Sequence, residues 1–144
     1  MDAQRLDGAD FRGTCLRSAR LARMGLSKTR LQGVDLQEAD LSLSNLFRAD
    51  LSGANLIRAD LHGASLVAAI LTGAELGSAN LHNASLFQAD LTQAHLEGAR
   101  LTGTDLSAAR LDNADLTDAQ YNRQTLWPPG FDPAQAGANL VVEP

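Results

Sequence analysis

The sequence has little of three features that often define a protein's class: cysteine, aromatic residues and long apolar runs. Its single cysteine, Cys15, excludes an internal disulfide framework and makes a reducing, cytoplasmic compartment the default expectation. Met1 is followed directly by polar residues, so no secretory signal is predicted. No apolar run approaches the ~20 residues of a membrane span. Aromatic residues make up only 4% of the chain, so we expect smaller side chains to fill the core.

What the sequence does have is a five-residue period. A leucine or an aromatic residue stands at every fifth position from Leu6 to Leu126 without a break. A small residue usually stands two positions earlier, as Ala59 does before Leu61, and the unit reads A-(D/N)-L-x-x. Residues five apart face opposite sides of a strand, and on a helix they lie about 140° apart. Neither element buries all the leucines, so the chain must bend after each unit and point every leucine at a common axis.

Four such bends close a square coil of about twenty residues, and stacked coils can pair their backbones at the ~4.8 Å spacing of neighbouring strands. Residues 1–126 are therefore predicted to form an all-β, quadrilateral parallel β-helix of about six four-sided coils. Glycines gather two positions after the leucine, as at Gly53 and Gly63, where we expect the corners.

The two ends of the stack are predicted to differ. The period breaks after Leu126 into a proline-rich segment, and residues 127–144 are interpreted as a C-terminal cap in which Trp127 and Phe131 fold over the last coil. The segment 139–142 is expected to cover more of that coil. The first coil is expected to stay partly open, which makes this end a second candidate contact surface. A homodimer through a solenoid end or through an apolar face is possible.

Residues twenty apart should stack, with the leucine and the small residue before it pointing inward and the others outward. One outward column is mostly apolar. Its members are Phe47, Val67, Phe87, Ser107 and Trp127. Leu43, Ile57 and Ile70 are outward on other faces of the same coils. Stacked apolar residues either stabilise neighbouring coils or mark a protein contact, and the sequence leaves both interpretations open.

The charges are distributed unevenly along the chain. Residues 1–30 contain seven basic and three acidic residues, a net charge of +4, whereas the rest contains five basic and fourteen acidic residues, a net charge of −9. Some opposite charges should pair between coils, as Asp90 with Arg110. Because the body is acidic, direct binding of nucleic acid is not expected, although stacked carboxylates could imitate the charge of duplex DNA.

Candidate chemistry is sparse. His62 and His82 are twenty residues apart and should stack, but two imidazoles with one flanking carboxylate are too few for a transition-metal site. His95 lies on another face and joins no recognisable group. Cys15 has basic neighbours but no predicted histidine beside it. No nucleotide-binding or nucleophile-elbow motif occurs, so we expect no catalytic residue, no metal and no cofactor.

The unit, as in Ala49-Asp50-Leu51-Ser52-Gly53, resembles the pentapeptide-repeat family over about residues 4–127. The tail resembles the ending of bacterial members, especially cyanobacterial ones. Its matching residues are Ala119-Gln120-Tyr121-Asn122, Thr125, Trp127-Pro128 and Gly130-Phe131-Asp132-Pro133. The resemblance implies a right-handed quadrilateral β-helix and, for most members, no established biochemical activity.

The resemblance also implies two kinds of function. Some members are quinolone-resistance proteins that mimic DNA and bind DNA gyrase, but this chain has no evident long loop or C-terminal dimerisation helix and carries a net charge of only −5. Others regulate a partner protein through the outer face. The leading prediction is a non-enzymatic interaction scaffold with an unidentified protein partner and no role for nucleic acid or membrane; the alternative is a gyrase-binding DNA mimic. The predicted contact residues are Phe47, Val67, Phe87, Ile57 and Ile70.

Overall fold

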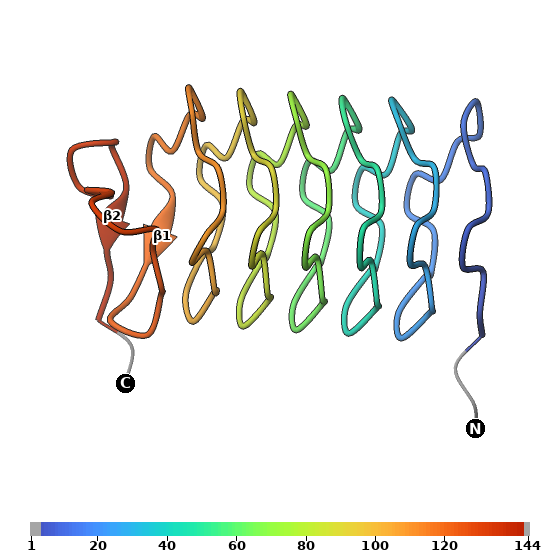
Figure 1. The fold of residues 1–144 in the computed structure, drawn as a ribbon, viewed down its shortest axis with the longest axis horizontal. Coiled ribbons are helices and arrows are strands. Elements are labelled where there is room, and N and C mark those ends of the chain that lie inside the picture. Colours follow the sequence, from blue (N-terminus) through green and yellow to red (C-terminus); the bar gives the residue numbers. More distant parts are fainter. Residues whose placement is uncertain (1–3, 143–144) are drawn as a thin grey trace.

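The computed structural model of the protein describes residues 4–142, and the chain winds through them as a stack of similar coils (Figure 1). Residues twenty apart pair in parallel from coil to coil, from Arg5 with Gly25 to Arg100 with Gln120, and the last single bridge joins Asp105 to Leu126, twenty-one residues on. These steps mark out six coils, as predicted from the period. None of the described residues belongs to a helix with the length and hydropathy needed to cross a membrane.

Each five-residue side of a coil ends in a hydrogen-bonded turn. The Leu51 carbonyl accepts a hydrogen bond from the Ala54 N–H at 3.0 Å, and Gly53, two positions after the leucine, has a φ of +65°. This is the pattern of a type II turn, which requires positive φ at its third residue. Non-glycine residues take the same conformation at other corners, as Arg58 does at 58°.

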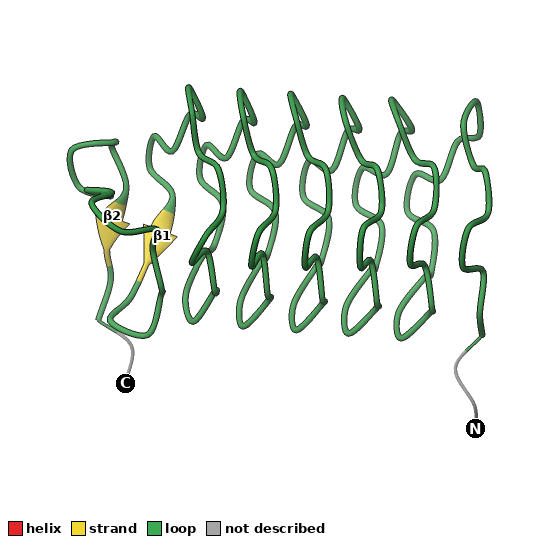
Figure 2. Cartoon of the chain, in the orientation of Figure 1, coloured by secondary structure: helices red, strands yellow, loops and turns green. Residues whose placement is uncertain are grey.

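The frequent turns leave room for only single-residue pairing between most coils. The described residues contain two strands, β1 (Gln120–Tyr121) and β2 (Asn139–Leu140), and the remaining coils are drawn as loop (Figure 2). Their backbone groups are nevertheless used: the Leu51 N–H donates to the Ile70 carbonyl at 2.7 Å, and the Gly53 N–H to the Thr72 carbonyl at 2.9 Å. Coil-to-coil hydrogen bonds therefore replace the ladder of a conventional sheet.

The core is a column of leucines and alanines inside the coils. The central leucines from Leu26 to Leu106 are buried, as are most of the small residues two positions before them. Where a hydroxyl replaces alanine it finds a partner, since Thr29 Oγ1 donates to the Leu26 carbonyl at 2.8 Å and Ser44 Oγ to the Leu41 carbonyl at 2.6 Å. In the first coil the central residues Leu6, Phe11 and Leu16 are only partly buried, so this end of the core is less covered.

The aspartate or asparagine before the leucine holds the backbone of the next turn. Asp50 Oδ1 accepts a hydrogen bond from the Ser52 N–H at 3.0 Å, and Asn55 Oδ1 accepts one from the Ile57 N–H at 3.1 Å. Either residue serves, because the bond requires only an acceptor oxygen two residues before the amide. The residue before the leucine therefore faces outward and also stabilises the turn. The sequence analysis did not predict this second role.

The register shifts by one residue after Tyr121. Asp105 pairs with Leu126, twenty-one residues on, so Asn122 and Thr125 take the inward places and Leu126 is 53% exposed. The prediction that Leu126 continues the core was wrong. So was the placement of Trp127 in the outward column of Phe87, because the extra residue moves Trp127 to the following, inward place, where it packs against the core.

Hydrogen bonds explain why the chain accepts this shift. Asn122 Oδ1 accepts hydrogen bonds from the Gly103 and Gln124 N–H groups at 2.9 and 3.1 Å. Thr125 Oγ1 donates to the Leu101 carbonyl at 2.7 Å. The two polar side chains are thus satisfied inside the last coil, where an unpaired polar group would be costly.

The C-terminal segment covers the last coil with aromatic rings and a short strand. The Trp127 ring meets Tyr121 edge-on at 5.5 Å and stacks on Phe131 at 5.2 Å between centroids. Strand β2 pairs in parallel with β1, with Gln120 opposite Asn139. The end of the stack near the C-terminus therefore has both its core and its β1 edge occupied.

We expect Gly53→Ala to lower the free energy of unfolding by about 1 kcal/mol, because an L residue is strained at positive φ. A Cβ at Gly53 meets nothing within 4 Å, so strain is the only cost. Gly77→Ala is the matched control: Gly77 lacks a positive φ, and its Cβ would make ordinary contacts at 3.8 and 3.9 Å. Urea unfolding should show a loss for the first variant alone; equal stability of both would contradict the turn argument.

We expect Trp127→Ala to cost about 3 kcal/mol of stability through loss of ring packing, whereas Trp127→Phe should cost less than about 1 kcal/mol. The Trp127 indole nitrogen is buried without a hydrogen-bond partner among the described residues, so phenylalanine retains the stacking and removes an unpaired donor. Thermal unfolding of both variants measures the difference. A phenylalanine variant as unstable as the alanine variant would show that the indole makes a contact beyond ring packing.

Candidate interaction faces and a histidine cluster

The predicted apolar column is present on one face of the coils. Phe47, Val67 and Phe87 occupy the same place in successive coils, because the Arg48 N–H donates to the Val67 carbonyl at 3.0 Å and the Ala68 N–H to the Phe87 carbonyl at 2.9 Å. Phe47 and Val67 are half-buried, and Phe87 is 38% exposed. The column therefore presents part of each apolar side chain to solvent.

Two further exposed residues border this column. Leu43, 44% exposed, stands at the corner where the chain enters the face, and Ile70, 40% exposed, follows the corner where the chain leaves it one coil later. We call Leu43, Phe47, Val67, Ile70 and Phe87 the apolar face. On the side that carries Phe47, Val67 and Phe87, the other outward residues of the three middle coils carry one charge, that of Arg48. Ile70 lies on the next side, between Asp50 and Asp90 in its own column. The Arg48 guanidinium lies 5.3 Å from the centroid of the Phe47 ring, which is cation–π geometry.

Ile57 does not belong to the apolar face. Ile57 comes two corners after Phe47. Two corners are half of a four-sided coil, so Ile57 lies on the opposite side of the molecule. There Ile57 lines a shallow depression of about 240 Å³ together with Glu75, Gly77, His95 and Glu97. The five residues singled out from the sequence are thus divided among three sides: Phe47, Val67 and Phe87 share one, Ile70 lies on the next, and Ile57 lies opposite the column.

His95 is part of a cluster that sequence reasoning missed. Its Nδ1 lies 3.2 Å from Glu97 Oε1, and the ligand atoms of His95, Glu97 and Asp115 all lie within 4.8 Å of one another. Asp115 Oδ1 accepts hydrogen bonds from the Thr117 hydroxyl at 2.7 Å and N–H at 3.0 Å. These two hydrogen bonds lower the pKa of Asp115, and the bond from the Thr117 hydroxyl contributes more than the bond from its N–H. The cluster could have been found from the spacing of its residues: Glu97 is two positions and Asp115 twenty positions after His95, which places all three on one face.

His62 and His82 stack as predicted, with ring centroids 6.1 Å apart and an angle of 19° between the rings. The His82 ring also makes a hydrogen-bond contact with Thr102: its Nδ1 lies 2.7 Å from Thr102 Oγ1 and 3.0 Å from the Thr102 carbonyl. The nearby Asp60 Oδ1 accepts the His62 N–H at 3.0 Å. This arrangement is a surface stack, and the contacts of His82 point it toward the next coil.

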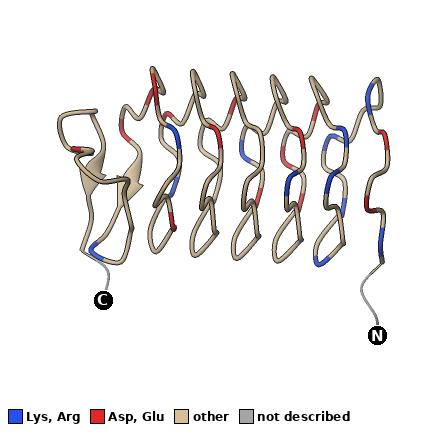
Figure 3. Cartoon of the chain, viewed as in Figure 1, with Lys and Arg blue, Asp and Glu red and all other residues tan. Residues whose placement is uncertain are grey.

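The charge pattern follows the sequence prediction, with basic residues concentrated toward the N-terminal coils (Figure 3). Arg12 pairs with Asp10 at 2.8 Å, and its hydrogen bond holds the pKa of Asp10 well below the usual range. The expected pairing between coils occurs at 3.9 Å between Arg110 and Asp90. These pairs are solvent-exposed, so each contributes little to stability.

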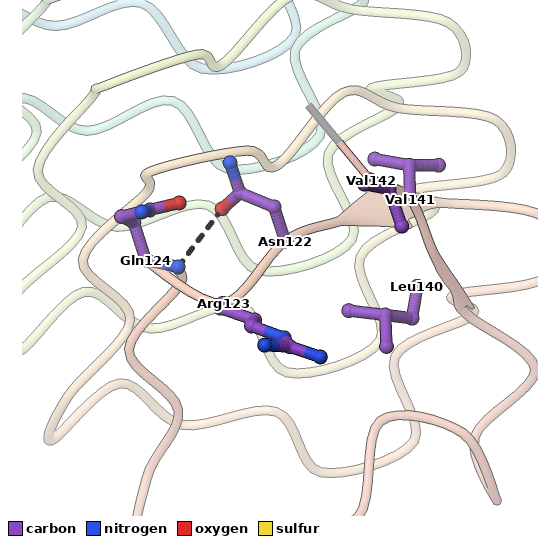
Figure 4. Close-up of a pocket in the computed structure, with 6 residues that line it drawn as sticks. All are labelled: Asn122, Arg123, Gln124, Leu140, Val141 and Val142. Atoms are coloured by element: carbon purple, nitrogen blue, oxygen red, sulfur yellow. Dashed lines mark hydrogen bonds between the residues drawn. The ribbon is translucent and has the colours of Figure 1, made fainter. Parts of the chain in front are cut away.

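A second depression lies on the C-terminal segment, with a volume of about 260 Å³ (Figure 4). Its lining residues are Asn122, Arg123, Gln124, Leu140, Val141 and Val142. Leu140 and Val142 are 52% and 92% exposed, while the Asn122 side chain is held by the Gln124 N–H (Figure 4). Among the described residues that line the depression, Arg123 is the one that carries a charge.

The fold defines the molecule as a quadrilateral β-helix, and comparison with known proteins agrees. The family model of pentapeptide repeats matches residues 5–42, 44–83 and 79–118 in eight copies. The chain therefore belongs to the pentapeptide-repeat family, whose members form right-handed quadrilateral β-helices. No match was found among curated protein sequences.

Solved structures give the same result. The pentapeptide repeat protein Rfr23 from the cyanobacterium Cyanothece 51142 is 30% identical, with a TM-score of 0.65 over 85% of this chain and 90% of that one. The pentapeptide repeat protein alr5209 from Nostoc Pcc 7120 is 34% identical, with a TM-score of 0.59 over 85% and 84%. A pentapeptide repeat protein from the Arabidopsis thaliana thylakoid lumen is 29% identical, with a TM-score of 0.55 over 65% and 68%.

We expect stability to fall in acid through the aspartates that hold the turns. The Ser42 hydroxyl lowers the pKa of Asp40, and the Thr92 hydroxyl lowers that of Asp90. Since each folded pKa lies below the unfolded value of ~3.9, this stabilisation is fully present above about pH 4 and is lost as the pH falls through the folded pKa.

The matched variant is Asp40→Asn with Asp90→Asn, which keeps an acceptor oxygen in each turn but cannot titrate. Urea unfolding across an acid pH series should show a shallower loss of stability for this variant than for the wild type. Identical pH profiles would contradict the contribution of these two carboxylates.

Proposed function

We propose that the protein is a non-enzymatic scaffold that binds another protein through the apolar face. The observation that carries the proposal is the exposure of Phe87 on the side with the fewest charges, with Leu43 and Ile70 exposed at the two borders of that side. Contiguous apolar surface that is poor in charge is typical of the centre of a protein interface. The regular rod offers this surface on a rigid support, which lowers the entropy cost of binding.

The apolar column is not needed to hold the coils together. At the same place in other coils stand serines, and the Gly8 N–H still donates to the Ser27 carbonyl at 2.8 Å. The Gln88 N–H likewise bonds to the Ser107 carbonyl, at 3.4 Å. Since the backbone contacts form without an aromatic residue, stacking alone does not account for Phe47 and Phe87. This difference favours a binding role over a purely structural one.

The surroundings of the apolar face indicate the chemistry of its partner. The residues between the apolar side chains are short and polar, including Asn45, Ser65 and Ser85, and they can form a hydrogen-bonding rim. Arg48 adds one cation beside the Phe47 ring. We infer a partner that presents apolar side chains at its centre and an acceptor or carboxylate opposite Arg48.

The alternative, a DNA mimic that binds gyrase, has less support. A mimic requires continuous columns of negative charge, yet Asp50 shares its column with Arg30 and Ile70, and Arg110 follows Asp90. We therefore do not adopt it. Inhibition of gyrase supercoiling by excess protein, or protection of gyrase from a fluoroquinolone, would favour the mimic instead.

The cytoplasmic location remains a proposal. It rests on the lone cysteine, Cys15, which is exposed and free and would be kept reduced in that compartment. Self-association through the apolar face is one form that partner binding can take. Light scattering of the purified chain distinguishes a homodimer from a different partner.

We expect the double substitution Phe47→Ser and Phe87→Ser to weaken partner binding by roughly 30-fold or more, the effect of losing one interface hot spot of about 2 kcal/mol. Affinity capture from the native cell identifies the partner, and titration of that purified partner gives the affinity. Ile57→Ser, on the opposite side, is the matched control and should bind normally.

Retention of every partner and of the oligomeric state by the double variant would overturn the proposal. An equal loss with Ile57→Ser would also overturn the choice of face, because it would show a general effect on the fold. Circular dichroism and thermal unfolding of both variants establish that they remain folded.

A further inference from the structure

We propose that His95, Glu97 and Asp115 form a binding site for a divalent first-row transition metal ion, with Zn²⁺ as the probe. The ligand atoms of the three side chains lie within 4.8 Å of one another. The cluster occupies the side of the solenoid opposite the apolar face. The proposal is therefore independent of the scaffold function.

The separation of the first two ligands already suits one ion. Zinc binds imidazole nitrogen and carboxylate oxygen at ~2.0–2.2 Å, so two ligands of one ion lie about 3–3.5 Å apart. His95 Nδ1 and Glu97 Oε1 are 3.2 Å apart. The Asp115 ligand atom lies within 4.8 Å of the other two, so a side-chain rotation is expected to bring it to the same ion.

The backbone holds the three residues in place. The His95 N–H donates to the Ala74 carbonyl and the Asp115 N–H to the Ala94 carbonyl, both at 2.9 Å, while the Glu97 carbonyl accepts the Ser78 N–H at 2.9 Å. His95 and Asp115 are paired in the same column. The backbone positions of the three residues are therefore fixed by the solenoid, so that only side-chain conformations are lost on binding.

Thr117 orients one of the carboxylates. Its hydroxyl and N–H both donate to Oδ1 of Asp115, at 2.7 and 3.0 Å, which leaves Oδ2 for an ion. Hydrogen bonds of this kind, to a ligand from outside the coordination sphere, commonly orient metal-binding side chains.

The site is open on one side because the neighbouring coil has a glycine. Gly77 occupies the column of Glu97, and the resulting depression of about 240 Å³ is lined by Ile57, Glu75, Gly77, His95 and Glu97. It has room for a fourth ligand, either water or a group from another molecule. Glu75, paired in the backbone with His95, adds a third carboxylate that favours a cation.

The chemistry of the ligands selects the class of ion. Imidazole favours zinc, copper or nickel, whereas magnesium and calcium prefer oxygen ligands alone. The other histidine pair provides an internal contrast. His62 and His82 are stacked 6.1 Å apart, and His82 contacts Thr102, so they bring no three ligands together.

The test is calorimetric titration of the full, untagged chain with Zn²⁺ alone. We expect one ion per chain, and we expect His95→Gln and Glu97→Gln each to weaken binding by at least about 10-fold, the lower limit seen when even an outer partner of a metal ligand is removed. His62→Gln is the matched control and should bind as the wild type does. Thermal unfolding without metal establishes that each variant is folded.

Thr117→Val tests its role as a positioning residue. We expect the affinity to fall roughly 10- to 100-fold with the stoichiometry unchanged, and Thr117→Ser to restore it because the hydroxyl returns. The pair separates orientation of Asp115 from a general effect on the coil.

Three results would overturn the proposal: no saturable binding to the wild type, binding that survives both His95→Gln and Glu97→Gln, or binding that is lost in His62→Gln. The Phe47→Ser and Phe87→Ser variant should bind Zn²⁺ normally. Failure of the metal site is therefore distinguishable from failure of the proposed partner-binding face.

Discussion

The structure depends on one hydrogen-bonded turn, closed every five residues from a leucine carbonyl to the N–H three positions on. Because the turn requires positive φ two residues after the leucine, it forces the chain around a corner and sends the next leucine to the same axis. Most coils can then pair only at isolated residues. Core, corners and coil-to-coil hydrogen bonds are therefore consequences of one local geometry, repeated along the chain.

Much of this geometry could be predicted from the sequence because the core is periodic. A leucine at every fifth position is incompatible with a helix or a flat strand having one buried face, and the glycine corners agree with the same coil. The turn role of Asp50 and Asn55 was less accessible, since an acidic residue before a leucine also fits a merely solvated position. Its signal was the exchange of Asp for Asn, which conserves the acceptor oxygen and discards the charge.

The sequence was a poorer guide wherever the structure departs from strict repetition. Leu126 fits the five-residue period, but Asn122 and Thr125 gain buried hydrogen bonds when the register moves by one. Those bonds place Trp127 over the core, where its ring packs between Tyr121 and Phe131. The choice depends on contacts across twenty or more residues, which a local pattern does not contain. The same limit applies to His95 and Asp115, which meet only because coils stack.

The outward positions separate into those that serve the turn and those that do not. Asp40 and Asp60 are paired in adjacent coils, an arrangement in which like charges repel. Each nevertheless accepts a turn N–H at 3.0 Å, and this bond to the charged form offsets part of the repulsion. Stacked aspartates therefore have a structural explanation and require no ligand.

Glu75 and His95 lack that explanation. Both occupy the place before the leucine where the repeat has aspartate or asparagine, and both line the depression opened by Gly77. Phe47, Val67 and Phe87 likewise replace the short polar residues found in the same column at Ser27 and Ser107. Since the fold is satisfied without these side chains, selection for folding does not account for them. Binding is therefore to be sought at these two surfaces, whose side chains neither the turn nor the core requires.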